Sequence, residues 1–241
     1  MTDTHLGNEH TSKRYDAELA RLIDEIVRMG ALAAEQLASA AEAVDERNSE
    51  LAARVVERDG AIDVLEQEVS NDVLRLLALR QPIARDLREV LAALRIASDI
   101  ERIGDYAANV AKRGIALNQV APMRPAAALP RLAMVAGEML RDVLAAYRDR
   151  DDHAAHEVWE RDEELDAMYT ALFRELLTYM MEDPRNITPC THLLFMAKNI
   201  ERIGDHATNI AENVFFLVHG VPLVEARRKG DLTNLMTSPK A

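Results

Sequence analysis

Cysteine is almost absent from this sequence of 241 residues, in which Cys190 is the single one. One cysteine cannot form an intramolecular disulfide or a cysteine-rich zinc site. The chain also lacks an apolar run of about 18 residues that could span a membrane, and its first residues lack the apolar core of a secretory signal. We therefore expect a cytoplasmic protein without membrane insertion, in which Cys190 packs as a small apolar side chain.

Basic residues are too few to balance the acidic ones. Lys and Arg number 29 against 41 Asp and Glu, which gives a formal net charge of −12. This charge repels phosphate backbones, and no basic stripe with interleaved aromatic residues is present, so we expect no nucleic-acid partner. The sequence also has no Gly-rich phosphate loop, no Walker motif and no nucleophile beside an evident base, so no catalytic residue is predicted.

One stretch of the chain occurs twice. Residues 100–110 read IERIGDYAANV and residues 200–210 read IERIGDHATNI, at an offset of one hundred. Two further blocks, 55–69 and 158–172, align in the same order at an offset of 103. A period of this length indicates a duplicated domain.

The spacing of apolar residues predicts helices in both halves. No segment alternates between apolar and polar residues as a strand does, whereas three-and-four spacing recurs in six long segments. The second helix of each half carries a heptad line, formed by Val55, Ile62, Val69 and Leu76 in the first half and by Val158, Leu165, Leu172 and Tyr179 in the second. The predicted fold is all-α, with two tandem antiparallel three-helix bundles.

Breaks in the helical pattern define the expected boundaries. The first helix should begin near Asp16, the second should run unbroken to about Leu79, and the third should begin at Pro82, since proline fits a first turn. The proline-rich segment between the halves shows no helical pattern. The predicted divisions are a flexible N-terminus (1–15), a first bundle (16–118), a linker (119–130), a second bundle (131–220) and a C-terminal tail (221–241).

The repeated stretch places acidic residues on one helix face. Glu101 and Asp105 are four residues apart, and Asn109 adds an amide oxygen one turn further. Like charges at this spacing cost about 0.2–0.5 kcal/mol, and Gly104 between them costs about 1 kcal/mol relative to alanine. Gly104 would also let a neighbouring backbone or a bulky ligand approach closely. The arrangement is locally unfavourable, and yet it occurs twice.

Further acidic pairs lie at the rim of the core-facing side of the second helix of each half. If that helix lies beside the third, four carboxylates converge per half, and such oxygen-rich sites are favoured by iron, manganese or magnesium. The candidate metal ligands are Asp59, Asp63, Glu101, Asp105 and Asn109 in the first half, and Asp162, Asp166, Glu201, Asp205 and Asn209 in the second.

The same acids allow a second interpretation, as solvated faces bridged by arginines such as Arg58, Arg102 and Arg161. His206 is expected to be a satisfied or exposed histidine and not a ligand, because its counterpart in the first half is Tyr106. The Glu-x-x-His motif of ferritin-like di-iron bundles is absent.

Residues 79–113 and 182–214 resemble the two signature segments of the PhoU family, which regulates phosphate uptake in bacteria. The resemblance covers nearly the whole chain. It implies two three-helix bundles and, in members that carry metal, multinuclear iron or zinc bound by Glu/Asp-x-x-x-Asp motifs. Those motifs fall here on Glu101 with Asp105, Glu201 with Asp205, Asp59 with Asp63, and Asp162 with Asp166.

The resemblance also implies a function and partners. Members act as cytoplasmic adaptors that couple the high-affinity phosphate ABC transporter, through its ATPase subunit, to a phosphate-sensing histidine kinase, and they keep starvation genes off when phosphate is plentiful. On the residues alone, a carboxylate-bridged metalloenzyme, a metal store and a purely structural scaffold stay open. We expect a non-enzymatic regulator.

A homodimer is implied by the family and is compatible with the third helix. That helix carries two apolar stripes that lie nearly opposite one another, so it should contact neighbours on both sides. The stripes consist of Ile83, Leu87, Val90 and Leu94, and of Ile96, Ile103, Val110 and Leu117.

Overall fold

The structure is a computed structural model that describes the backbone of residues 4–223 and the side chains from residue 15 onward. Helices account for nearly all of this part of the chain, and it contains no β-strand. The helices are α1 (Thr4–Asp45), α2 (Ser49–Arg58), α3 (Gly60–Arg80), α4 (Arg85–Leu117), α5 (Leu129–Asp149), α6 (Asp152–Glu182) and α7 (Ile187–His219). The all-α prediction is confirmed.

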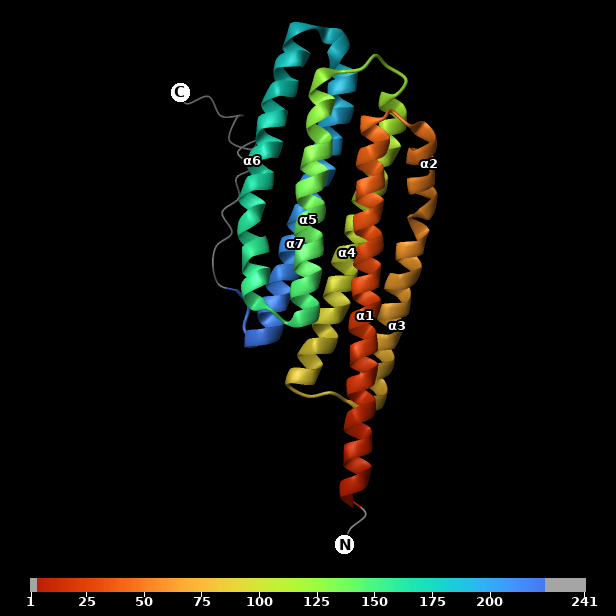
Figure 1. Cartoon of the computed structure of the whole chain (residues 1–241), viewed down its shortest axis with the longest axis vertical. Coiled ribbons are helices and arrows are strands. Elements are labelled where there is room, and N and C mark those ends of the chain that lie inside the picture. Colours follow the sequence, from red (N-terminus) through yellow and green to blue (C-terminus); the bar gives the residue numbers. More distant parts are fainter. Residues whose placement is uncertain (1–3, 224–241) are drawn as a thin grey trace.

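Two bundles of three rods stand side by side (Figure 1). The first consists of α1, the α2–α3 rod and α4, and the second consists of α5, α6 and α7. Successive rods run antiparallel. The bundles join where α4 packs against α7 and where α1 packs against α5, so the two helices with the repeated stretch meet in the middle of the molecule.

The heptad lines of the second rods face the core, as the sequence predicts. Each buried Val, Leu or Ile contributes about 1.5–3 kcal/mol, so these lines orient the rods. Seven of their members are at most 5% exposed, and the eighth packs against the core from a partly buried position: Val55, Ile62, Val69, Leu76, Val158, Leu165, Leu172 and, last, Tyr179.

The second rod of the first bundle is interrupted at Asp59, where one unbroken helix was predicted. Asp59 keeps right-handed helical dihedrals (φ −53°, ψ −44°), and its carbonyl oxygen accepts a hydrogen bond from the amide of Ile62 at 3.0 Å. This three-residue spacing is a local tightening of the helix, placed where Gly60 follows. The corresponding part of α6 is continuous.

The ends of the first bundle also differ from the prediction. α1 begins at Thr4, inside the segment 1–15 that was predicted to be flexible and that contains no proline. α4 begins at Arg85 and not at Pro82, because Ala84 adopts φ 50° and ψ −110°, outside the helical region. Ile83 therefore lies before the helix and is 77% exposed, so its place on an apolar stripe was wrong.

The connection between the bundles contains more regular structure than the sequence indicated. A 3-10 helix covers Arg124–Ala128, and α5 begins at Leu129 within the predicted linker. Pro125 and Pro130 both lie in first turns, where proline needs no hydrogen-bonded amide.

The second bundle ends as predicted at a glycine. Gly220, with φ 74°, donates its amide to the carbonyl oxygen of Phe216 at 2.8 Å and closes α7. Of the predicted tail, residues 224–241 lie outside the described residues. Cys190 is buried as a free thiol, as expected.

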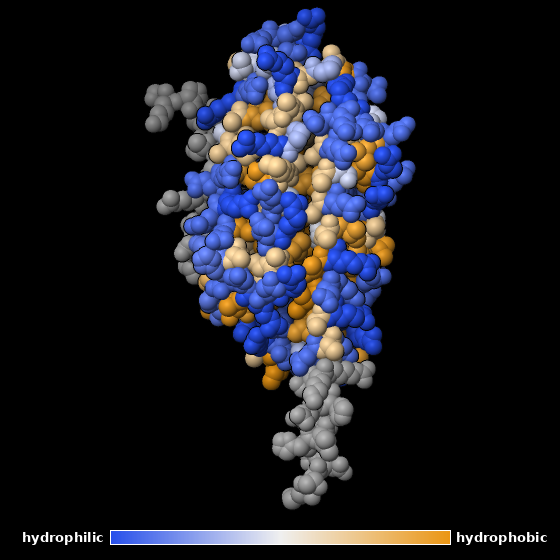
Figure 2. All heavy atoms as spheres, in the orientation of Figure 1, coloured by the Kyte–Doolittle hydropathy of each residue, from blue (hydrophilic) through white to orange (hydrophobic). Residues whose placement is uncertain are grey.

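The face of the molecule in Figure 2 is mostly hydrophilic, and apolar residues appear on it in narrow strips between helices. Among the described helices, none has the length and apolar character needed to cross a membrane.

Candidate functional site

The repeated stretches lie on α4 and α7, and each packs against the second rod of its own bundle, α3 or α6. Each bundle thereby brings two acidic pairs to neighbouring helices, as the sequence predicted. We call Asp59, Asp63, Glu101 and Asp105 the first carboxylate set, and Asp162, Asp166, Glu201 and Asp205 the second carboxylate set.

The first carboxylate set gathers beside Gly104. A Cβ atom at this position would lie 2.8 Å from Ile62 Cδ1 and 3.7 Å from Asp59 Oδ1, so the glycine lets the second rod come this close. Asp59 Oδ1 accepts a hydrogen bond from Gln36 Nε2 at 2.9 Å, and the same nitrogen donates to the carbonyl oxygen of Gly104 at 3.2 Å. Gln36 thus ties α1 to both rods that carry the set.

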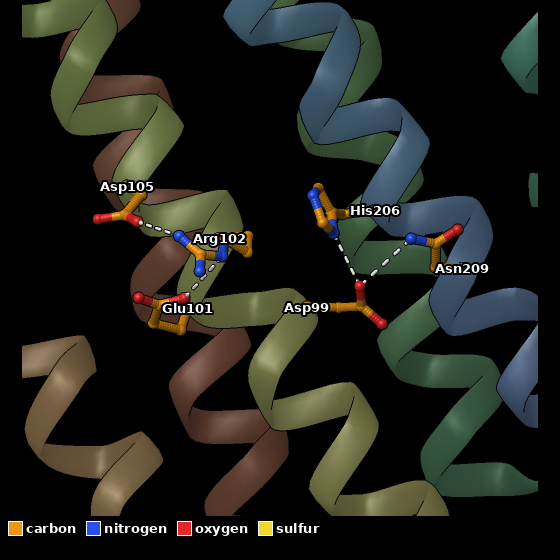
Figure 3. Close-up of polar contacts among 6 residues, drawn as sticks. All are labelled: Asp99, Glu101, Arg102, Asp105, His206 and Asn209. Carbon is orange, nitrogen blue, oxygen red and sulfur yellow. Dashed lines mark hydrogen bonds and ion pairs between the residues drawn. The ribbon is translucent and has the colours of Figure 1, made fainter.

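Burial and neighbouring charges raise the pKa of two carboxyl groups in the first carboxylate set. Burial raises the pKa of Glu101, the Asp105 charge raises it further, and Arg102 opposes the shift. Burial also raises the pKa of Asp59 against the hydrogen bond from Gln36. Arg102 Nη1 donates to Asp105 at 3.2 Å and its Nε lies 3.5 Å from Glu101 (Figure 3). The Arg102 side chain is 56% exposed, so solvent weakens both interactions.

The second carboxylate set is more deeply buried. Asp162 is 3% exposed and Asp166 is 2% exposed, whereas the corresponding Asp59 is half-buried and Asp63 is exposed. A Cβ atom on Gly204 would overlap Leu165 Cδ2 and would lie 3.5 Å from Asp162 Oδ1. The glycine contact is therefore common to both halves, and the depth of burial is not.

Glu201 is a buried member of the second carboxylate set, and its two oxygens differ in their contacts. One oxygen, Oε1, accepts a hydrogen bond from Lys198 Nζ at 2.7 Å, and the other, Oε2, is buried without a hydrogen-bond partner among the described residues. Burial raises the pKa of Glu201 to about 7 against the hydrogen bond from Lys198, and the charges of Asp205 and Asp166 add to the rise. A buried carboxylate oxygen left unpaired is destabilising unless it gains a proton or a cation.

The two asparagines differ from the carboxylates in their surroundings. Asn109 and Asn209 are both half-buried. Asn209 Nδ2 donates to Asp99 Oδ1 on α4 at 3.3 Å, and His206 Nδ1 lies 2.7 Å from the same oxygen (Figure 3). Since a carboxylate only accepts, the imidazole donates this bond. His206 is the satisfied histidine that was expected, and the amide nitrogen of Asn209 contacts the other motif helix and not the second carboxylate set.

The arginines explain only part of the acidic pattern. Arg102 bridges Glu101 and Asp105, as the solvated-face interpretation requires. Arg58 instead lies 4.0 Å from Glu35, and Arg161 pairs with Glu138 at 2.9 Å on α5. These two arginines therefore pair with acids on α1 and α5.

The donor atoms suit a hard metal ion, although the side chains are not arranged around one. Within the part of the chain that the structure describes, no three acidic, histidine or cysteine side chains take positions that could hold one metal ion. Arg102 and Lys198 form ion pairs with carboxylate oxygens that such an ion would use. Carboxylate oxygens are ligands that iron, manganese and magnesium accept, and the unpartnered Oε2 of Glu201 fits this role.

Two residues of the site were missed from the sequence. Gln36 interrupts the apolar line of the first helix between Ala33 and Leu37, and a polar residue at such a position is the signal that could have found it. Lys198 stands three residues before Glu201, which is the spacing of an opposite-charge pair on a helix.

Comparison with known proteins gives the family. The model of the PhoU domain matches residues 26–114 and again residues 129–214. The chain belongs to the PhoU family. It is 59% identical over 227 residues to the phosphate-specific transport system accessory protein PhoU homolog of Xylella fastidiosa, which covers 94% of this chain and 96% of that protein. The homolog of the same name from Rhizobium meliloti is 46% identical, over 97% of this chain and 99% of that protein.

Solved PhoU structures share the fold. The crystal structure of PhoU from Pseudomonas aeruginosa superposes with a TM-score of 0.83 at 36% identity, over 86% of this chain and 100% of that one. The phosphate transport system regulatory protein PhoU from Streptococcus pneumoniae gives a TM-score of 0.80 at 30% identity, over 87% and 99%. These relatives are named as accessory or regulatory proteins and not as enzymes, which confirms the expected non-enzymatic class.

Proposed function

We propose that this chain is a cytoplasmic accessory protein of a phosphate transport system, where it acts as a negative regulator of phosphate uptake and of the phosphate-starvation response. The observation that carries the proposal is the 59% identity, over 94% of the chain, to a protein named as an accessory protein of a phosphate-specific transport system. The PhoU domain repeats in both halves, so the similarity covers the acidic stretches as well as the core.

The proposed mechanism is that of an adaptor. The chain couples the ATPase subunit of the high-affinity phosphate ABC transporter to a phosphate-sensing histidine kinase, and it does so as a homodimer. Long helices supply extended contact surfaces for protein partners, and the face in Figure 2 is mostly hydrophilic. The net charge of −12 favours such partners over nucleic acid.

Metal binding is the second part of the proposal. Each carboxylate set would hold iron or zinc, with manganese or magnesium as alternatives, and bound metal would supply positive charge at buried acids. Support comes from the all-oxygen donors and from the unpartnered Oε2 of Glu201. The amide oxygens of Asn109 and Asn209 would complete the ligands, since Asn209 already uses its nitrogen on Asp99.

A reporter assay tests the regulatory role. The chain is expressed in a bacterium that lacks its own PhoU protein and carries a phosphate-starvation promoter fused to a reporter. We expect the wild-type chain to keep the reporter off in high phosphate and the Glu101→Ala/Glu201→Ala double variant to fold and yet leave it on. A wild-type chain that fails to repress would overturn the proposed regulation.

The matched control is the double variant Glu35→Ala/Glu138→Ala, which removes two acids at equivalent positions of α1 and α5. Their ion pairs with Arg58 and Arg161 lie on the surface, where such pairs contribute about 0–1 kcal/mol. This variant should repress as the wild type does. Normal repression by the Glu101→Ala/Glu201→Ala variant would separate regulation from the carboxylate sets.

A further inference from the structure

We propose that Lys198 is a resident counter-ion of the second carboxylate set, which competes with a bound divalent cation and lowers the affinity of that set relative to the first. The inference rests on the proposed metal binding, and it assigns a residue that controls how strongly each half of the chain takes up the ion.

The geometry places the Lys198 ammonium at the edge of the set. Its Nζ lies 2.7 Å from Glu201 Oε1, and the Lys198 side chain is 33% exposed while that of Glu201 is 4% exposed. The same Nζ lies 5.0 Å from the centroid of the buried Tyr169 ring on α6, within the range of a cation–π interaction. Two contacts from two helices therefore hold the ammonium against a buried carboxylate.

The first carboxylate set carries a different charge at each of the two equivalent positions. Ser98 stands three residues before Glu101 where Lys198 precedes Glu201, and Glu66 replaces Tyr169. The charge of Glu66 reaches Glu101 and contributes to its raised pKa. The duplication has thus given the first set an additional acid and the second set a lysine.

In each set a basic side chain contacts the glutamate directly, and these two side chains, Arg102 and Lys198, are held differently. Arg102, beside Glu101 and Asp105, is 56% exposed and can turn into solvent at little cost. Arg202, its counterpart, places its guanidinium 5.7 Å from the centroid of the Tyr106 ring. Lys198 is the cation that contacts Glu201.

Competition follows from the shared ligand atom. The ammonium and a metal ion carry charge of the same sign, so each weakens the binding of the other at a shared carboxylate. A cation that enters the second carboxylate set meets Glu201 with Oε2 open and with Oε1 hydrogen-bonded to Lys198, so coordination through both oxygens is opposed by the Lys198 charge. At the first set, Lys112 acts on Asp59 through its charge, and among the described residues no lysine donates a hydrogen bond to a carboxylate of this set.

A manganese titration tests the inference, with free aqueous Mn²⁺ followed by electron paramagnetic resonance. The proteins are the wild type, Lys198→Met, which keeps an apolar stem without the charge, and Ser98→Lys, which moves a lysine to the equivalent position of the first half. Variants with Glu101→Ala/Asp105→Ala or Glu201→Ala/Asp205→Ala assign each binding class to one set.

We expect Lys198→Met to tighten binding at the second carboxylate set by about tenfold to a hundredfold, the equivalent of one charge-assisted hydrogen bond, and to leave the first unchanged. Ser98→Lys should weaken binding at the first set alone. Lys198→Met should also show the larger rise in unfolding temperature on addition of Mn²⁺, because a tighter ligand stabilises the folded state more.

The outcomes separate this inference from the proposed function. Mn²⁺ bound at both sets with affinities unchanged in Lys198→Met and Ser98→Lys would overturn the role of Lys198 and keep the metal sites. Absence of Mn²⁺ uptake in every protein would overturn both, while the reporter assay would still decide the regulatory role. If Lys198→Met fails to fold, Ser98→Lys tests the same competition in the first half.

Discussion

The two carboxylate sets come from one repeated motif and occupy different environments. Both gather at a glycine, Gly104 or Gly204, that lets the neighbouring rod approach. The first is half open to solvent and has an exposed arginine beside its acids. In the second, Asp162, Asp166 and Glu201 are buried, and Glu201 is paired with a lysine. The close contact of the glycine with the neighbouring rod is common to both halves, whereas the surrounding side chains differ. The neighbours of a motif therefore determine its electrostatics as much as the motif does.

The largest expected effect concerns Glu201. Its ordinary pKa is 4.5 and burial raises the pKa to about 7 in the folded state, so between these values the folded chain binds more protons than the unfolded chain. The stability of the metal-free protein therefore falls as pH rises from about 4.5 to 7, and the loss is complete above 7.

Glu201→Gln removes this dependence, and it should stabilise the metal-free protein at pH 8 by about 2–3 kcal/mol. Urea unfolding from pH 5 to 8 measures the difference. Glu101→Gln is the matched control and should give a smaller change, because the Glu101 side chain is 26% exposed. Equal effects of the two variants would contradict the contrast in burial.

The glycine contacts come next. Gly204→Val should destabilise the protein by about 2–3 kcal/mol, since the added atoms overlap the buried Leu165, and overpacked cores lose this much. Gly104→Val should lose less, because its Cβ would lie 2.8 Å from Ile62 Cδ1, a smaller overlap than the one with Leu165 Cδ2 at Gly204. Thermal unfolding of both variants tests the order, and a larger loss at Gly104 would reverse it.

The junction between the bundles gives a smaller effect. Asp99 accepts hydrogen bonds from His206 and Asn209, and its counterpart Asn199 makes no comparable bond between described residues. Asp99→Ala should lower the free energy of unfolding by about 1–2 kcal/mol, whereas Asn199→Ala should change it by less than about 0.5 kcal/mol. Similar losses in denaturant unfolding would mean that the Asp99 contacts do not join the bundles.

The smallest expected effect is at Arg102. Because its ion pairs are exposed, Arg102→Ala should change stability by less than about 0.5 kcal/mol in 150 mM salt. Calorimetry measures this, with Arg202→Ala as the control from the other half. A loss of several kcal/mol in the free energy of unfolding on removal of Arg102 would show that this arginine, and not solvent, compensates the negative charges of the first carboxylate set.

Periodicity and duplication predicted the fold, because both are properties of the sequence itself. The heptad line from Val55 to Leu76 faces the core, and the all-α class follows from it. The start of α4 could not be predicted in the same way, since Pro82 is compatible with a first turn and Ala84 adopts a positive φ that alanine rarely takes.

Residues of the candidate site could be predicted from the sequence where they occur at equivalent positions in both halves. Glu101 and Glu201 stood out because they recur, whereas Gln36 has the apolar counterpart Met139 and Lys198 has the neutral counterpart Ser98. A residue that occurs in one half alone does not recur in the sequence, and its contacts depend on which helices become neighbours. The difference in burial between the two sets follows from those same contacts and cannot be predicted from the motif alone.

Metal content is the most direct test of the account. Elemental mass spectrometry on protein purified without chelator or affinity metal would be compared with a variant in which Glu101, Asp105, Glu201 and Asp205 are all alanine. The account predicts two or more iron, zinc or manganese ions per chain in the wild type and their loss in the variant. Equally metal-free samples would contradict it and would make both carboxylate sets partner-facing or solvated surfaces.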